Sequence, residues 1–79
     1  NTLIAVYPNP ASGQFNVFNK STDEGIVKVY SSTGKLLFEK VIVGQKELNI
    51  NASDWPLALY RVQIMYADGT FANSSLLIK

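Results

Sequence analysis

Apolar and polar residues alternate along most of this chain. The clearest alternation spans residues 60–66, where every second position holds a large apolar side chain: Tyr60, Val62, Ile64 and Tyr66. A period of two is that of a β-strand with one buried face. Further runs of strand-forming residues, bounded by turn-forming residues, lie at 3–7, 14–18, 26–30, 35–43, 46–50 and 70–78. We therefore predict about seven short strands and no buried helix.

Two of the segments between these runs predict hairpins. Ser31–Gly34 carries a glycine near its tip and predicts that strands 26–30 and 35–43 are paired. Ala67–Thr70 contains an Asp-Gly pair, which favours a two-residue type I′ turn with a positive φ at both central residues. These turns predict antiparallel neighbours.

Residues 51–56 are the one place where a single helical turn is plausible. Ser53 or Asp54 is a suitable N-cap, and Pro56 would end the turn. Trp55 lies within this segment, and we expect its large ring to close one end of the core.

Tyr7–Gly13 is a proline-bracketed segment between the first two predicted strands. Pro8 and Pro10 fix their own φ, lack an N–H donor and push the preceding residues toward extended geometry. Gly13 supplies whatever φ the reversal needs. We predict a rigid corner here.

The fold class follows from the number and length of the strands. An antiparallel, immunoglobulin-like Greek-key sandwich buries about seven short strands. The 79 residues allow one domain, and an apolar fraction of 47% is typical of a globular one. The chain begins at Asn1 rather than Met, so we expect 1–79 to be one domain cut from a longer protein.

Composition removes most catalytic chemistry. The chain has no His and no Cys, which are the commonest general base and the best thiol nucleophile. A small hydrolase would therefore have to use carboxylates such as Glu39 or Asp54. The acidic residues do not have the spacing of a calcium-binding loop. The net charge of +1 is scattered and predicts no nucleic-acid partner. We expect no catalytic residue, no metal and no cofactor.

The last strand has a second interpretation besides ordinary pairing within its own sheet. A terminal strand at a sheet edge offers unpaired N–H and C=O groups to a partner. Residues 74–79 carry a single charge, at Lys79. Self-association through this strand is therefore one expectation, beside the alternative of a strand buried in its own sheet.

Several motifs in this order resemble a known family. They are Tyr7–Gly13, Val29–Lys35, Leu59–Val62, Asp68–Gly69 and Leu76–Lys79. With them, essentially the whole chain resembles the C-terminal sorting domain (type A) of cargo proteins of the type IX secretion system. The resemblance implies an immunoglobulin-like sandwich that acts as an address label without catalysis.

The resemblance also implies partners and recognition residues. The partners would be the outer-membrane type IX translocon of a Gram-negative bacterium and a sortase-like peptidase. The cargo would pass through the periplasm, lose the domain and be joined to a surface lipopolysaccharide. The residues that match the family's motifs, and hence the expected translocon-recognition residues, are Pro8, Asn9, Pro10, Gly13, Gly34, Lys35, Tyr60, Leu77, Ile78 and Lys79.

The chain departs from the family pattern at two positions. Ala58 stands where the family usually has Gly, so this turn must use a negative φ or accept strain. Ser75 stands where the terminal motif commonly carries a second Lys. Neither departure affects the predicted fold.

A binding or stalk module of a secreted enzyme is the alternative function. Such a module would hold sugar on exposed aromatic rings or space an enzyme from the surface. The candidate rings are Phe18, Tyr30, Phe38, Trp55 and Tyr66. The same rings are expected in the core, because aromatic side chains supply much of the core area of a small domain.

Overall fold

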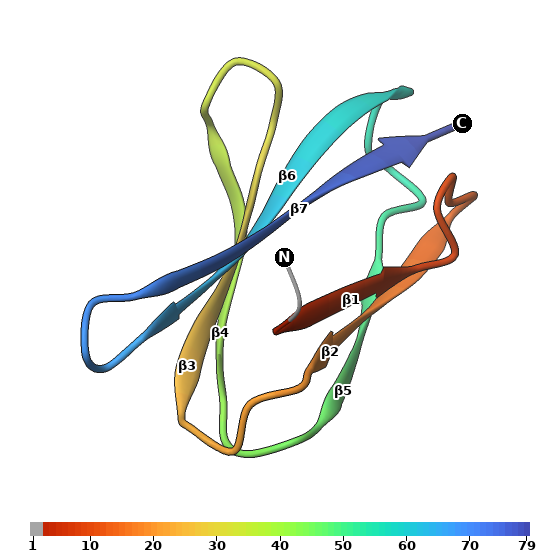
Figure 1. Ribbon diagram of the computed structural model, residues 1–79. Helices are drawn as coiled ribbons and strands as arrows, with labels where there is room; N and C mark the ends of the chain where they lie inside the picture. Colours follow the sequence, from red (N-terminus) through yellow and green to blue (C-terminus); the bar gives the residue numbers. More distant parts are fainter. Residues whose placement is uncertain (1–2) are drawn as a thin grey trace.

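The computed structural model describes residues 3–79 and consists of strands joined by turns and loops (Figure 1). Its seven strands are β1 (Ile4–Tyr7), β2 (Gln14–Asn19), β3 (Gly25–Tyr30), β4 (Leu36–Ile42), β5 (Glu47–Asn51), β6 (Ala58–Tyr66) and β7 (Phe71–Ile78). The strand count and the all-β class predicted from the sequence are confirmed.

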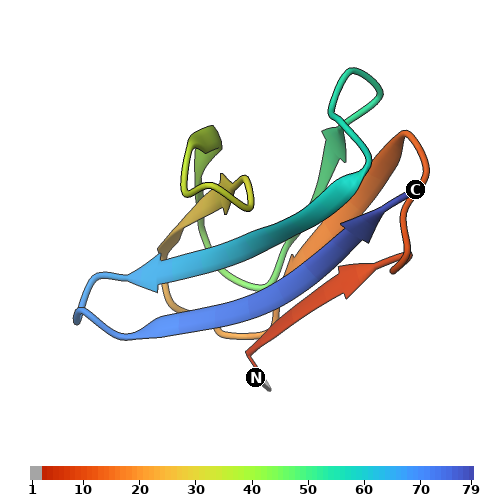
Figure 2. The same cartoon turned by 90° about the horizontal axis from the view of Figure 1, so that it is seen from above.

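The strands form two antiparallel sheets that face each other. One sheet has the order β1-β2-β5 and the other the order β4-β3-β6-β7. The chain passes from one sheet to the other between β2 and β3, between β4 and β5, and between β5 and β6, which gives a sandwich (Figures 1 and 2). The hairpin predicted around Ser31–Gly34 is present as β3 paired with β4.

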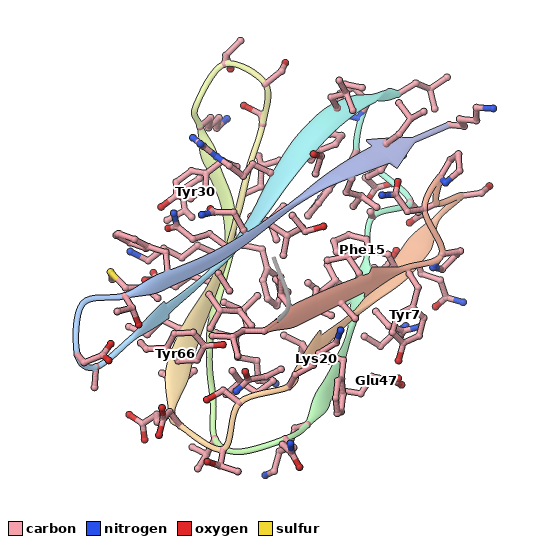
Figure 3. All side chains as sticks on the ribbon, in the orientation of Figure 1. Tyr7, Phe15, Lys20, Tyr30, Glu47 and Tyr66 are labelled. Carbon is pink, nitrogen blue, oxygen red and sulfur yellow. The ribbon has the colours of Figure 1, made fainter. Side chains whose placement is uncertain are left out.

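The core lies between the sheets and follows the period-two pattern of the strands. On β6 the alternate residues Tyr60, Val62, Ile64 and Tyr66 are all buried, as the alternation predicts. Phe15 and Val17 of β2 meet them from the opposite sheet, and the Phe15 ring points into the space between the layers (Figure 3). Burial of this apolar area is the main driving force for folding.

Trp55 closes one end of this core, as expected. Its ring lies 5.9 Å from that of Phe15 and 5.4 Å from that of Tyr60, measured between ring centroids. The Tyr60 hydroxyl donates a hydrogen bond of 2.5 Å to the carbonyl of Pro56. The loop before β6 is thereby fastened to the core from within.

The helical turn predicted over residues 51–56 is wrong. The Ser53 N–H donates to the side-chain oxygen of Asn51 at 3.0 Å, and the Trp55 N–H donates to the Ala52 carbonyl at 3.0 Å. An Asx turn from Asn51 therefore takes the Ser53 N–H, and the Trp55 N–H that a Ser53 cap would serve bonds a backbone carbonyl instead. The segment is a loop of turns that directs Trp55 inward.

The type I′ turn predicted at Asp68-Gly69 is also wrong. Gly69 has a φ of 89°, but no non-glycine residue in the described chain has a positive φ. The Gly69 N–H donates to the Tyr66 carbonyl, so the turn has three residues and ends in a left-handed glycine. The Asp68 carboxylate accepts bonds from the hydroxyl and the N–H of Thr70, at 2.7 and 3.0 Å. These bonds lower the pKa of Asp68 and stabilise this geometry.

Asn19 is the buried polar side chain at the other end of the sandwich, opposite Trp55. Its oxygen accepts bonds from the Tyr66 hydroxyl at 2.8 Å and from the Ser21 N–H at 3.1 Å. Its amide nitrogen donates to the carbonyls of Asp23 and Gly44, both at 3.1 Å. Asn19 thus joins two loops and both sheets, and its side-chain hydrogen-bonding capacity is filled.

Replacing Asn19 with Ala should destabilise the fold strongly. Buried partners would lose their bonds, and we expect a loss of at least about 3 kcal/mol in the free energy of unfolding. Tyr66→Phe removes one bond only and should cost about 1 kcal/mol. Urea unfolding measures both. The control is Asn49→Ala, because the amide of Asn49 donates a hydrogen bond to Asn16 on the exposed face of the sheet. An equal loss of unfolding free energy for Asn19→Ala and Asn49→Ala would contradict the structural role of Asn19.

Candidate functional site

The proline corner and the end of the terminal strand lie side by side (Figure 2). Ala11 forms a parallel bridge with Ile78. The Ala11 N–H donates to the Leu77 carbonyl at 2.8 Å, and the Lys79 N–H donates to the Ala11 carbonyl at 2.9 Å. Ala11 and Ile78 are both buried. The corner therefore adds a very short strand to the outer edge of β7.

The side chain of Asn9 extends this pairing. Its amide nitrogen donates to the Ser75 carbonyl at 3.0 Å, and its oxygen accepts the Leu77 N–H at 3.0 Å. A carboxamide has the same donor and acceptor as a peptide unit. Asn9 thus acts as a substitute peptide group one step along β7 from Ala11. We call the contacts of Asn9 and Ala11 with β7 the clamp.

The clamp defines what kind of edge β7 presents. β7 pairs with β6 within its own sheet and lies at the edge of that sheet, so each of the two interpretations of the terminal strand holds in part. Its end is nevertheless not open, because the clamp bonds backbone groups of Ser75, Leu77 and Lys79. The flanking Pro8 and Pro10 have no N–H of their own, and the peptide bonds before both are cis.

The start of β6 pairs with the other side of the terminal strand. Ala58 lies opposite Ile78, and Tyr60 lies opposite Leu76. Ala58 does not have a positive φ, so it takes the place of the family's glycine in an unstrained conformation. Tyr60 and Ile78 are both buried, so these two predicted site residues pack in the core beneath the clamp.

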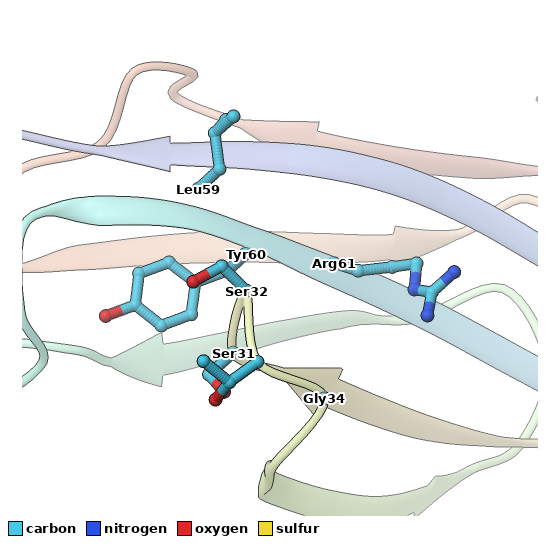
Figure 4. A pocket seen from close by; sticks show the side chains of 7 residues that line it. Ser31, Ser32, Gly34, Leu59, Tyr60 and Arg61 are labelled. Atoms are coloured by element: carbon cyan, nitrogen blue, oxygen red, sulfur yellow. The ribbon is translucent and has the colours of Figure 1, made fainter.

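The turn between β3 and β4 lies beside the start of β6. Gly34 has a φ of 89° and donates its N–H to the Ser31 carbonyl, and the Lys35 N–H donates to the Ser31 hydroxyl at 3.1 Å. An open depression of about 430 Å³ separates this turn from β6 (Figure 4). Its lining is Ser31, Ser32, Thr33, Gly34, Leu59, Tyr60 and Arg61.

The predicted recognition residues therefore gather at one end of the sandwich. The corner with Gly13, the start of β6 and Leu77–Lys79 are joined by hydrogen bonds, and Gly34 and Lys35 lie across the depression. The Asp68–Gly69 turn lies at the opposite end (Figure 1). Sequence reasoning missed the role of the Ser75 carbonyl, because a backbone acceptor leaves no signal in residue type.

The outer face of the three-stranded sheet carries a polar contact next to the corner. The Tyr7 hydroxyl donates a hydrogen bond to the Glu47 carboxylate (Figure 3). This bond, more than burial, raises the pKa of Tyr7. Within residues 3–79, no group of three or more acidic, His or Cys side chains is placed to hold a metal. No helix in that part is long and apolar enough to cross a membrane.

Comparison with known proteins identifies the family. The sequence model of one protein family, the secretion system C-terminal sorting domain, matches residues 5–79, which is nearly the whole chain. The chain belongs to this family of type IX sorting domains. A search of curated proteins finds no match.

A solved structure supports the fold of the sorting domain independently. It is the crystal structure of a DUF3244 family protein with an immunoglobulin-like β-sandwich fold from Bacteroides vulgatus ATCC 8482. The similarity has a TM-score of 0.77 at 14% sequence identity and covers 98% of this chain and 84% of the other. At this identity the similarity shows the fold alone, and it confirms the predicted sandwich.

Substituting Asn9 should loosen the end of β7 without unfolding the domain. Asn9→Ala removes both the donor to the Ser75 carbonyl and the acceptor of the Leu77 N–H. The amide hydrogens of Leu77 and Lys79 should then exchange at least about tenfold faster, because local opening costs less. The matched control is Asn73→Ala on the same strand. Equal protection of Leu77 in Asn9→Ala and the unsubstituted chain would contradict the clamp.

Proposed function

We propose that this sorting domain directs its parent protein from the periplasm through the outer-membrane type IX translocon of a Gram-negative bacterium. A sortase-like peptidase then removes the domain and joins the cargo to a surface lipopolysaccharide, so the cargo is secreted or displayed on the cell surface. The domain itself supplies recognition and no catalysis. The observation that carries this proposal is the family match over residues 5–79.

The geometry supports recognition at the end of the sandwich that holds the clamp. Family-like motifs from both ends of the chain meet there, although Asn9 and Leu77 are 68 positions apart. The exposed members of the predicted recognition residues are Pro8, Asn9, Pro10, Gly34, Lys35 and Lys79. A receptor that contacts this end would read the start and the finish of the domain together.

The carbohydrate-binding alternative has less support. Stacking on a sugar needs an exposed ring face, whereas Trp55 packs against Phe15 and Tyr60 at the end of the core. Tyr66 is buried as well. Two of the candidate rings, Trp55 and Tyr66, are therefore occupied by packing.

Fusing residues 1–79 to the carboxyl end of a periplasmic reporter tests the proposal. In a host with a type IX system, the fusion should reach the surface or the medium, and in a host without the translocon it should stay in the periplasm. Deleting Leu77–Lys79 should also retain it, because the deletion removes the predicted terminal signal. Cell fractionation measures the exported share.

A second fusion separates loss of signal from loss of folding. It keeps the buried Ile78 and carries Leu77→Ser with Lys79→Ser, two positions whose side chains are at least partly accessible. It should be retained in the periplasm while its resistance to protease stays unchanged. Export of both altered fusions at the level of the unaltered one would refute the proposed signal.

A further inference from the structure

Three accessible leucines lie at the end of the sandwich that holds the clamp. Leu59 of β6 lies opposite Leu77 of β7, and both belong to the face of the sheet that points away from the core. Leu57 precedes β6 in the adjoining loop. Leu57 is 74% exposed and Leu59 is 58% exposed, whereas Ile78 is only 3% exposed. We call Leu57, Leu59 and Leu77 the leucine patch.

The clamp restricts how a partner can contact the terminal residues. The backbone of Leu77 is bonded by Asn9 and Ala11 on the outer edge, and β6 pairs with β7 on the other side. A partner strand therefore finds no free edge at residues 77–79. Because Ile78 is buried, the accessible side chains of the terminal segment are Leu77 and Lys79. Recognition of residues 77–79 therefore has to use side chains on the outer face.

The charged side chains near the leucine patch are mostly positive. Arg61 is exposed on the same face of β6, where it lies opposite Ser75, and it lines the depression together with Leu59. Lys79 follows the patch in sequence, and Lys35 is exposed at the turn across the depression. Asp54 is an exposed acidic residue in the loop before Leu57, and the Glu47 carboxylate is bonded to Tyr7. Cations thus border an apolar centre.

We propose that the leucine patch docks a protein surface that is apolar at its centre and carries carboxylates at its rim. This inference rests on the proposed function, since the partner would be the receptor component of the secretion machinery. The carboxylates pair with Arg61 and Lys79, and an apolar side chain of the partner packs between Leu57, Leu59 and Leu77. Apolar anchors surrounded by a polar rim are the usual arrangement of such interfaces.

The same charges disfavour two other occupants. A second copy of the domain would bring Arg61 and Lys79 against their own equivalents, and like charges in contact oppose association. An anionic membrane is usually recognised by clusters of about four to eight Lys or Arg residues, more than surround this patch. A hetero-protein partner with acidic groups fits the observed pattern best.

Export of the reporter fusion with matched substitutions tests the inference. Leu57→Ser with Leu59→Ser should lower the exported share at least about tenfold, because truncating interface anchors typically costs that much or more. The controls are Val41→Ser and Phe71→Ser, which are 55% and 50% exposed and lie toward the opposite end. They should be exported normally. The fusion with Arg61→Glu should be retained in the periplasm, whereas the fusion with Arg61→Lys should be exported. The control fusion with Lys40→Glu should also be exported.

The outcomes separate this inference from the proposed function. Failure to export the unaltered fusion would overturn the proposed function itself. If the unaltered fusion and the Leu57→Ser, Leu59→Ser fusion are both exported normally, only the inference about the leucine patch is overturned. Two measurements on the purified fusions test the other occupants: sedimentation for self-association and flotation with phosphatidylglycerol vesicles for lipid binding. If the fusion forms a dimer or binds the vesicles, and Leu59→Ser abolishes that association, the inference of a protein receptor would also be overturned. Fusions that stay monomeric and do not bind vesicles support the inference.

Discussion

The outer edge of β7 is the constraint around which this end of the molecule is arranged. An edge strand leaves backbone donors and acceptors without partners, and exposed edges invite pairing with other chains. Here the Ala11 backbone and the Asn9 carboxamide supply partners for Ser75, Leu77 and Lys79. A corner that is poor in its own donors thereby protects the terminal strand without adding a full strand to the sheet.

This arrangement makes the conformation of the predicted recognition residues depend on the folded state of the domain. The bonds from Asn9 join residues 66 and 68 positions apart, so they exist only when both sheets are assembled. Trp55 and Tyr60 support the same end from the core, and Ala58 pairs with Ile78 from the adjacent strand. The backbone of the terminal residues is consequently bonded on both edges, and the groups of Leu77–Lys79 that remain accessible are side chains on the outer face.

Sequence patterns predicted the elements well where local physics decides the structure. The alternation in β6 fixed its buried face, because successive side chains of a strand point to opposite sides. The predictions that failed concern turns in which a side chain competes with the backbone. Asn51 forms an Asx turn in place of the expected helical turn, and Asp68 bonds Thr70 in place of a type I′ conformation. Several local hydrogen bonds are available to such residues, and spacing alone does not rank them.

By itself, the sequence determined seven strands, the sandwich class and the family, since strand periodicity and motif order are properties of the linear chain. It also predicted that Asn9 and Leu77 are both recognition residues. Only the tertiary structure decided that the Asn9 carboxamide pairs with the backbone of β7, that Ile78 is buried and that Leu57 and Leu59 stand exposed beside Leu77. The physical reason is that edge pairing and burial depend on which strands become neighbours, and that choice is made between segments far apart in the chain.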